Sequence, residues 1–147
     1  MSALLAQLQS DLNASRKSLN RAATLSLGTI ISDVKNRAIE LKRDLIDEDV
    51  VDVLQKGIKK RRESIELFVA GQRDDLADKE RAEVALLEKY LPAQVGADEL
   101  REAVRAAVAA GAVTVGAVMR KVMPQFKGRA DGSAINAIAR QELASKA

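Results

Sequence analysis

Four cationic side chains and two glycines lie within the run RKVMPQFKGRADG, residues 120–132. Lys and Arg at this density are typical of phosphate contacts, which position a nucleic acid without reading its sequence. Backbone amides at the start of the helix that follows could add to such a site, and glycines permit close backbone approach. The residues are Arg120, Lys121, Lys127, Gly128, Arg129 and Gly132.

An ordinary helix–loop–helix corner explains the same run. In that interpretation Asp131 caps the last helix, and the cations are simply solvated. The residue types alone do not choose between a phosphate site and a corner. The nucleotide-binding pattern GxxxxGK[ST] does not occur in the chain.

The chain contains no His and no Cys. Their absence excludes imidazole bases, thiolate nucleophiles, disulfides, and zinc sites built from these ligands. We therefore predict no catalytic residues, no metal site and no cofactor.

A second group of charges falls beside the apolar stripes of two helices that should form a hairpin. Folding the chain at Gln72 brings Arg61 or Arg62 level with Glu80 or Glu83. We predict a partly buried structural ion pair that fixes the register of the hairpin. A catalytic role for these carboxylates is disfavoured, because no other nearby group could act as their partner.

The basic run KGIKKRR, residues 56–62, belongs to the first helix of that hairpin. One interpretation is a solvated face, and the other is a ridge that binds phosphates. The Glu residues that follow directly favour the solvated face.

The elements that carry these residues are predicted to be helices. Apolar residues make up 47% of the chain and aromatic residues only 2%, so the core must be aliphatic. Ala, Leu, Glu, Lys and Arg are strong helix formers. Apolar side chains recur at helical spacing in residues 4–12, 27–45, 51–68 and 76–91. We predict an all-α fold that includes a long αα-hairpin.

A boundary falls in LPAQVGA, residues 91–97, where Pro92 stops the fourth helix. We predict an N-terminal helical domain over residues 1–92 and a small three-helix tail domain over residues 93–147. Gly96, Thr114 and Asp131 are the expected N-caps of the three tail helices.

Charge is unevenly distributed between these parts. Residues 1–90 contain 16 Lys and Arg against 16 Asp and Glu, which leaves 8 against 5 for residues 91–147. The net charge of +3 therefore lies in the tail, an excess that permits nucleic-acid contact without requiring it. The start of the chain lacks a basic leader, and its longest uncharged run is shorter than the ~20 residues that a bilayer requires. We expect a cytoplasmic protein with no membrane contact.

The segment VGAVMRKVMPQFKGRADGSAINAIARQEL, residues 115–143, resembles the tail domain shared by the YqeY family and GatB, the B subunit of the tRNA-dependent amidotransferases. The specific elements are the run from Gly116 to Met119, KGRADG from Lys127, and Asn136. Residues 34–68 and 70–92 also resemble free-standing YqeY proteins, so the resemblance covers nearly the whole chain. The chain departs from the family pattern at Ile46, where Asp47 is expected to cap instead, and at Gly57, which should cost the helix about 1 kcal/mol.

The resemblance implies a helical domain followed by a tail that, in the amidotransferases, helps to hold tRNA at the outer corner of its L. The kinase-like core and the amidase subunit of those enzymes have no counterpart in this chain. A family label of amidotransferase, a carbon–nitrogen ligase with glutamine as amido-N-donor, would therefore overstate its chemistry.

Three functions remain as alternatives. The first is a non-catalytic tRNA-binding accessory protein, related to the tail of the Glu-tRNA(Gln)/Asp-tRNA(Asn) amidotransferase B subunit. In it Lys121, Lys127 and Arg129 would contact phosphates, with Arg120 as a weaker contact. The second is a helical protein–protein interaction module with no RNA role, whose partner could belong to the translation or aminoacyl-tRNA machinery. The third, a true amidotransferase, lacks its catalytic parts.

Overall fold

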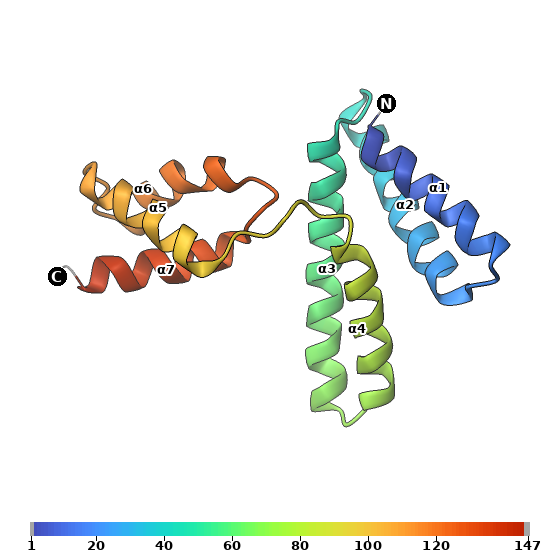
Figure 1. Ribbon diagram of the computed structural model, residues 1–147. Coiled ribbons are helices and arrows are strands. Elements are labelled where there is room, and N and C mark those ends of the chain that lie inside the picture. The colour runs from blue at the N-terminus through green and yellow to red at the C-terminus, as the bar shows by residue number, and fades with distance from the viewer. Residues whose placement is uncertain (1, 146–147) are drawn as a thin grey trace. The chain divides into compact units, whose positions relative to one another are not determined.

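The computed structural model describes residues 2–145, which form helices and contain no strand (Figure 1). This confirms the predicted all-α class. The elements in chain order are α1 (Ala3–Lys17), α2 (Arg21–Leu41), α3 (Asp47–Ala70), α4 (Asp74–Glu88), α5 (Ala97–Ala109), α6 (Val115–Val122), the 3-10 helix η1 (Met123–Phe126) and α7 (Gly132–Ser145). None of the helices within residues 2–145 combines the length and the apolar content needed to cross a bilayer.

Internal contacts divide the chain into two compact units, which separate between Leu91 and Pro92. The boundary predicted from the sequence lies one residue later, between residues 92 and 93. Each unit has its own hydrophobic core.

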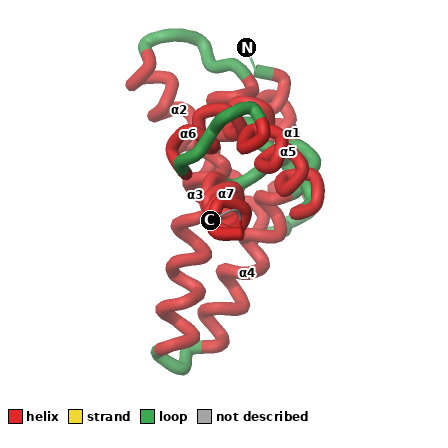
Figure 2. The backbone as a smooth tube through the Cα atoms, turned by 90° about the vertical axis from the view of Figure 1, so that its left-hand side faces the viewer, coloured by secondary structure: helices red, strands yellow, loops and turns green. Residues whose placement is uncertain are grey.

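The first unit is built from two helical hairpins, α1–α2 and α3–α4. Figure 2 shows α3 and α4 running side by side to their connecting turn. Each hairpin turns at a residue in the left-handed conformation, Leu19 with φ 58° and Gln72 with φ 58°. The largest fully buried side chains of this unit are Leu8, Leu27, Ile30, Leu54, Leu87, Val34 and Val50.

Gly57 allows α2 and α3 to approach closely. A Cβ atom added at Gly57 would lie 3.0 Å from Cδ1 of Ile30, which is fully buried. The expectation that Gly57 only weakens the helix was therefore incomplete, because its missing side chain makes room for the core of the first unit.

Two expectations for the chain between α2 and α3 were wrong. Leu45 was placed in the second helix, but α2 ends at Leu41 and Lys42 adopts a left-handed φ of 54°. Leu45 still reaches the core from the loop and is 6% exposed, because the turn returns its side chain to the apolar side.

Asp47 does not cap α3, whose N-cap is Ile46. The Ile46 amide instead donates to Oδ2 of Asp49 at 2.9 Å. The Asp47 carboxylate lies at the start of α1, where it accepts hydrogen bonds from the Ser2 hydroxyl and from the Leu4 amide. These bonds, the Ser2 hydroxyl first, lower the pKa of Asp47 and tie α1 to α3.

The second unit packs α5, α6 and α7 around a core that includes Leu100, Val104, Val118, Val122, Phe126, Ile135 and Ile138. The predicted N-caps are confirmed: Gly96 precedes α5, and the Thr114 hydroxyl accepts from the Ala117 amide at 3.1 Å. Instead of ending α6 at a loop, the chain continues into η1, with Pro124 in the first turn of the 3-10 helix.

Candidate nucleic-acid interface

The candidate interface is the segment of residues 120–132 that joins α6 to α7, called the cationic elbow from here on. Arg120 and Lys121 occupy the last turn of α6, and Lys127 and Arg129 follow η1. The side chains of all four are exposed. The structure therefore places the predicted cations at the surface of the second unit, on either side of η1.

Backbone hydrogen bonds hold the elbow in place from the inside. Phe126, which is 6% exposed, inserts into the core, and its carbonyl accepts from the Arg129 amide at 2.8 Å and the Ala130 amide at 3.1 Å. The Arg129 carbonyl in turn accepts from the Val95 amide at 3.0 Å. Gly128 has a φ of 77°, which explains the glycine at this turn. The cationic side chains thus project from a fixed backbone.

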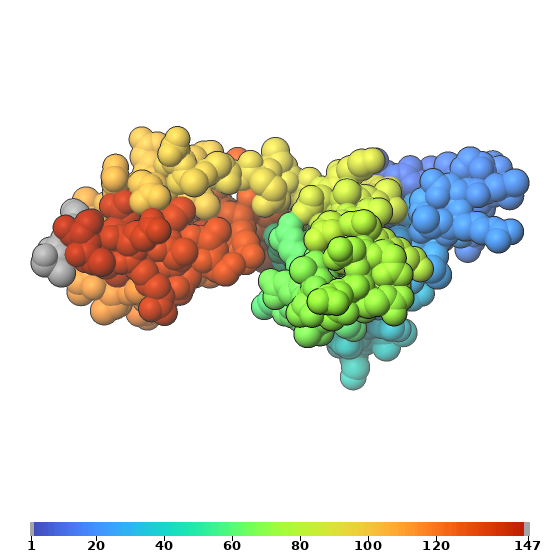
Figure 3. All heavy atoms as spheres, turned by 90° about the horizontal axis from the view of Figure 1, so that it is seen from below, coloured from blue at the N-terminus to red at the C-terminus, as the bar shows by residue number. Residues whose placement is uncertain are grey.

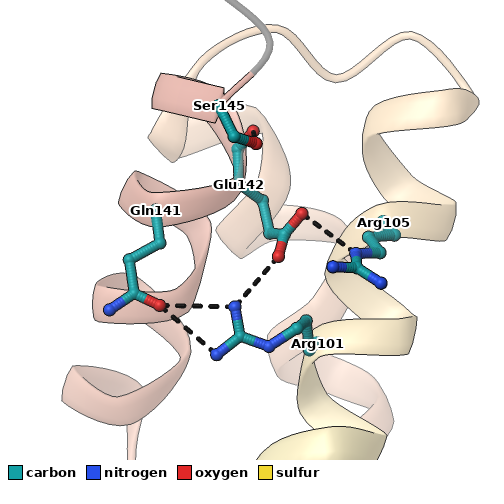
Figure 4. Close-up of polar contacts among 5 residues, drawn as sticks. All are labelled: Arg101, Arg105, Gln141, Glu142 and Ser145. Atoms are coloured by element: carbon teal, nitrogen blue, oxygen red, sulfur yellow. Dashed lines mark hydrogen bonds and ion pairs between the residues drawn. The ribbon is translucent and has the colours of Figure 1, made fainter.

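Two other arginines of this unit, Arg101 and Arg105, form ion pairs. Glu142 of α7 is 7% exposed and accepts from Arg101 Nη1 at 2.9 Å and from Arg105 Nε at 3.0 Å, both on α5 (Figure 4). The Oε1 atom of Gln141 also accepts from Arg101, at 3.3 Å. Arg105 and, after it, Arg101 lower the pKa of Glu142. This network joins α5 to α7 and gives both arginines a carboxylate partner, so that Glu142 offsets one of their two positive charges.

No carboxylate within residues 2–145 forms an ion pair with Arg120, Lys121 or Arg129. Arg120 donates only to the Gly116 carbonyl, across a long 3.4 Å. These charges are therefore available to an anion from solvent, unlike those of Arg101 and Arg105.

The amides at the start of α7 do not fit the predicted phosphate site. The Asp131 carboxylate accepts from the Ser133 amide at 3.1 Å, so it caps the helix and places a negative charge where an anion would bind. Gly132 has a structural reason as well, because an added Cβ would lie 3.3 Å from Cε of Met123. Any anion bound at the elbow must therefore rely on the cationic side chains.

In the α3–α4 hairpin of the first unit, one of the predicted ion pairs forms. Arg61 Nε lies 3.0 Å from Glu83 Oε2, and the two side chains are 13% and 19% exposed. Arg62 pairs with Glu88 instead of either predicted partner. Glu80 is half-buried and forms no ion pair among the described residues.

Sequence reasoning missed the Glu142 network. Its only local signal was the spacing of Arg101 and Arg105, four residues apart on one helix face. The lysines of the run KGIKKRR, Lys56, Lys59 and Lys60, are exposed, so both interpretations of that run remain open.

Fold and site together define an all-helical protein of two compact units, whose smaller unit carries an exposed cationic elbow. The family model described as Yqey-like protein matches residues 5–143, which is nearly the whole chain. The chain therefore belongs to the YqeY-like family, as its sequence motifs predicted.

Relatives include three fungal proteins, each named altered inheritance of mitochondria protein 41, mitochondrial. The protein from Pyrenophora tritici-repentis is 34% identical over 133 residues, which cover 86% of this chain and 73% of the relative. Those from Candida glabrata and Kluyveromyces lactis are 32% and 35% identical over 60% and 58% of this chain. The matches span about half the length of these two yeast proteins, 50% and 47%.

Proposed function

We propose that this chain is a non-catalytic tRNA-binding protein whose cationic elbow contacts the phosphate backbone. The observation that carries the proposal is the contrast among the arginines of the second unit. Arg101 and Arg105 share Glu142 as a carboxylate partner, whereas Arg120 and Arg129 are exposed without one. Arg140 of α7, which has no carboxylate partner among the described residues either, donates to Asn136 Oδ1 instead. The resemblance of residues 115–143 to the tRNA-holding tail of GatB supports the choice of RNA.

A folded, shape-recognised RNA fits these residues better than a single strand. Single-stranded RNA is usually held by stacking on aromatic side chains. The chain has one Tyr, two Phe and no Trp, and Phe126, the aromatic residue of the elbow, is buried in the core. Cations on a fixed backbone suit the phosphates of a tRNA corner.

Salt titration with matched variants tests the proposal. Bulk tRNA is titrated against the wild type, against Lys121→Gln/Arg129→Gln, and against Lys59→Gln/Lys60→Gln. The two double variants lose the same charge, and the second lies on the exposed face of the run KGIKKRR. Each lost phosphate contact should reduce the log–log salt slope by about 0.9.

The elbow variant should therefore show a slope shallower by about 1.8, and at 0.1 M salt it should bind roughly 50-fold more weakly. The Lys59/Lys60 variant should bind like the wild type. Equal losses in the two variants would show that binding is not specific to the elbow, and unchanged binding by the elbow variant would refute the assignment of the site.

The proposal includes two further expectations. We expect no glutamine-dependent amidation of misacylated tRNA by the purified chain, and any protein-dependent amidation would refute the non-catalytic assignment. We also expect a cytoplasmic location. Because the fungal relatives are named as mitochondrial proteins, fractionation of cells that express the tagged chain is the appropriate measurement.

A further inference from the structure

The free end of the α1–α2 hairpin carries a groove that the proposed RNA-binding function does not use. It has a volume of about 500 Å³, opens to solvent, and is lined by residues of both helices, among them Arg16, Leu19, Arg21, Leu25 and Gly28. Within the first unit, α1 and α2 extend away from α3 and α4 towards their own turn (Figures 1 and 3). On its other side this end of α2 faces α4, since Leu25 and Ser26 also line a smaller pocket with Glu83 and other residues of α4.

Two leucines of the groove are exposed to an unusual degree. Leu19 is 83% exposed and Leu25 is 61% exposed. Leu19 also has a φ of 58°, in the left-handed region where a side chain costs about 1 kcal/mol and where glycine is the usual residue. The backbone bonds around it, Asn20 amide to Ser15 carbonyl and Leu19 amide to Arg16 carbonyl, complete the turn without help from the leucine side chain. Turn formation therefore does not explain the leucine.

The groove also has a consistent charge. Its lining residues include the cations Arg16 and Arg21 but no Asp or Glu, and Lys17 follows Arg16 in the sequence. No carboxylate within residues 2–145 pairs with any of them. An apolar groove with an unneutralised basic rim is complementary to a surface that is both apolar and acidic.

We propose that this groove docks an acidic amphipathic helix of a protein partner. Arg21, Leu25, Gly28 and Ser32 recur at helical spacing along α2, so the surface offered is one helix face. A Cβ atom added at Gly28 would meet nothing within 4 Å, which leaves room for a second helix to approach closely. Leucines of the partner would bury Leu19 and Leu25, and its carboxylates would pair with the arginines.

Fluorescence anisotropy tests the proposal with two designed peptides of about 18 residues, or five helical turns. Both carry Leu at every third and fourth position, and the remaining positions are Glu-rich in one and Lys-rich in the other. The Glu-rich peptide should bind the full chain at least about tenfold more tightly than the Lys-rich peptide at low salt. If the two peptides bind equally, or if neither binds, the proposal is refuted.

Three variants locate the contact. Leu25→Ser should weaken binding of the Glu-rich peptide by about tenfold or more, since a buried leucine contributes that much affinity. Leu67→Ser is the matched control, because Leu67 is 74% exposed on α3 and lies outside the groove. Leu19→Gly should bind the peptide more weakly while its unfolding temperature stays equal or rises, so that unfolding cannot explain the loss. An equal loss with Leu67→Ser would refute the assignment to the groove.

Other occupants give different results. Self-association that Leu25→Ser abolishes, measured by sedimentation, would identify a second copy as the occupant and overturn the proposal. Binding of anionic vesicles or tRNA that depends on Leu19 or Leu25, with no peptide binding, would overturn it as well. The Lys121→Gln/Arg129→Gln variant should bind the peptide like the wild type, so this proposal and the RNA proposal fail independently.

Discussion

The Arg61–Glu83 pair offers the sharpest stability test in the first unit. It joins α3 to α4 through a 3.0 Å contact between Arg61 Nε and Glu83 Oε2. The guanidinium also donates from Nη1 to the Gly57 carbonyl at 3.0 Å. Both side chains are mostly buried, at 13% and 19% exposed, so neither charge recovers full hydration when its partner is removed.

The expected magnitude lies between two limits. Exposed pairs contribute about 0–1 kcal/mol, and removing one member of a fully buried pair costs about 3–5 kcal/mol. Because this pair retains some access to water, we expect Arg61→Met and Glu83→Leu each to lower the free energy of unfolding by about 2 kcal/mol. The double variant, which leaves no unpaired charge, should lie within about 1 kcal/mol of the wild type.

Urea unfolding followed by far-ultraviolet circular dichroism measures these values, since the chain has no Trp. Additive single losses would give a total of about 4 kcal/mol, so the predicted coupling energy is about 3 kcal/mol. If the pair also fixes the register of the hairpin, the double variant should keep its stability but lose hydrogen-exchange protection along α4. Unchanged or higher stability of Arg61→Met would refute a register-fixing pair.

Three further predictions test the fold and the elbow. Gly28→Ala should stabilise the chain by about 1 kcal/mol, because nothing lies within 4 Å of the added methyl group. Gly57→Ala should stabilise it less, because that methyl group would meet a buried side chain at 3.0 Å. Equal shifts in the urea midpoints of the two variants would contradict this prediction. Burial, and then the Asp11 carboxylate 2.6 Å from its hydroxyl, raise the pKa of Tyr90, the single Tyr of the chain. The stabilisation from this phenol should therefore be complete below pH ~10 and be lost as the pH rises through the raised pKa. Tyrosinate absorbance should have a midpoint above that of the urea-unfolded chain, and Asp11→Asn should lower it; a folded-state midpoint near 10 would count against the contact. Asp131→Asn should change the free energy of unfolding by less than ~0.5 kcal/mol, because Asn caps helices as well as Asp. The same substitution should tighten tRNA binding, because it removes a negative charge from the elbow. Unchanged affinity would be evidence against the proposed site.

Helical periodicity predicted the elements well because apolar stripes determine which face of each helix is buried. Thr114 shows how local a successful prediction can be, since its cap depends only on the three residues that follow it. The break between α2 and α3 could not be predicted in the same way. Leu45 continues the spacing of the stripe, and only the left-handed turn at Lys42 shows that the helix has already ended.

Tertiary contacts explain the remaining errors. Gly57 reads as a helix-weakening residue until Ile30 is found in the space that its side chain would fill. Asp47 has the position of an N-cap, yet its carboxylate binds the start of α1, which lies more than 40 residues earlier in the chain. Helix periodicity contains no information about contacts across such separations.

The sequence predicted which residues make up the candidate site, but not which cations of the tail form ion pairs. A count of 8 cations against 5 acidic residues describes the tail as weakly basic throughout. Glu142, however, forms its ion pairs with Arg101 and Arg105 of α5 and not with the elbow, so one carboxylate offsets one of those two charges. Asp98 and Glu99 occupy the first turn of α5, where a negative charge interacts favourably with the helix dipole. Outside residues 120–132 the tail contains four cations and four acidic residues, so its surplus lies at the elbow, where Asp131 is the sole acidic residue. Because the potential that attracts a phosphate depends on local charge within a Debye length of about 8 Å, RNA affinity should follow substitutions at the elbow and not the net charge of the chain.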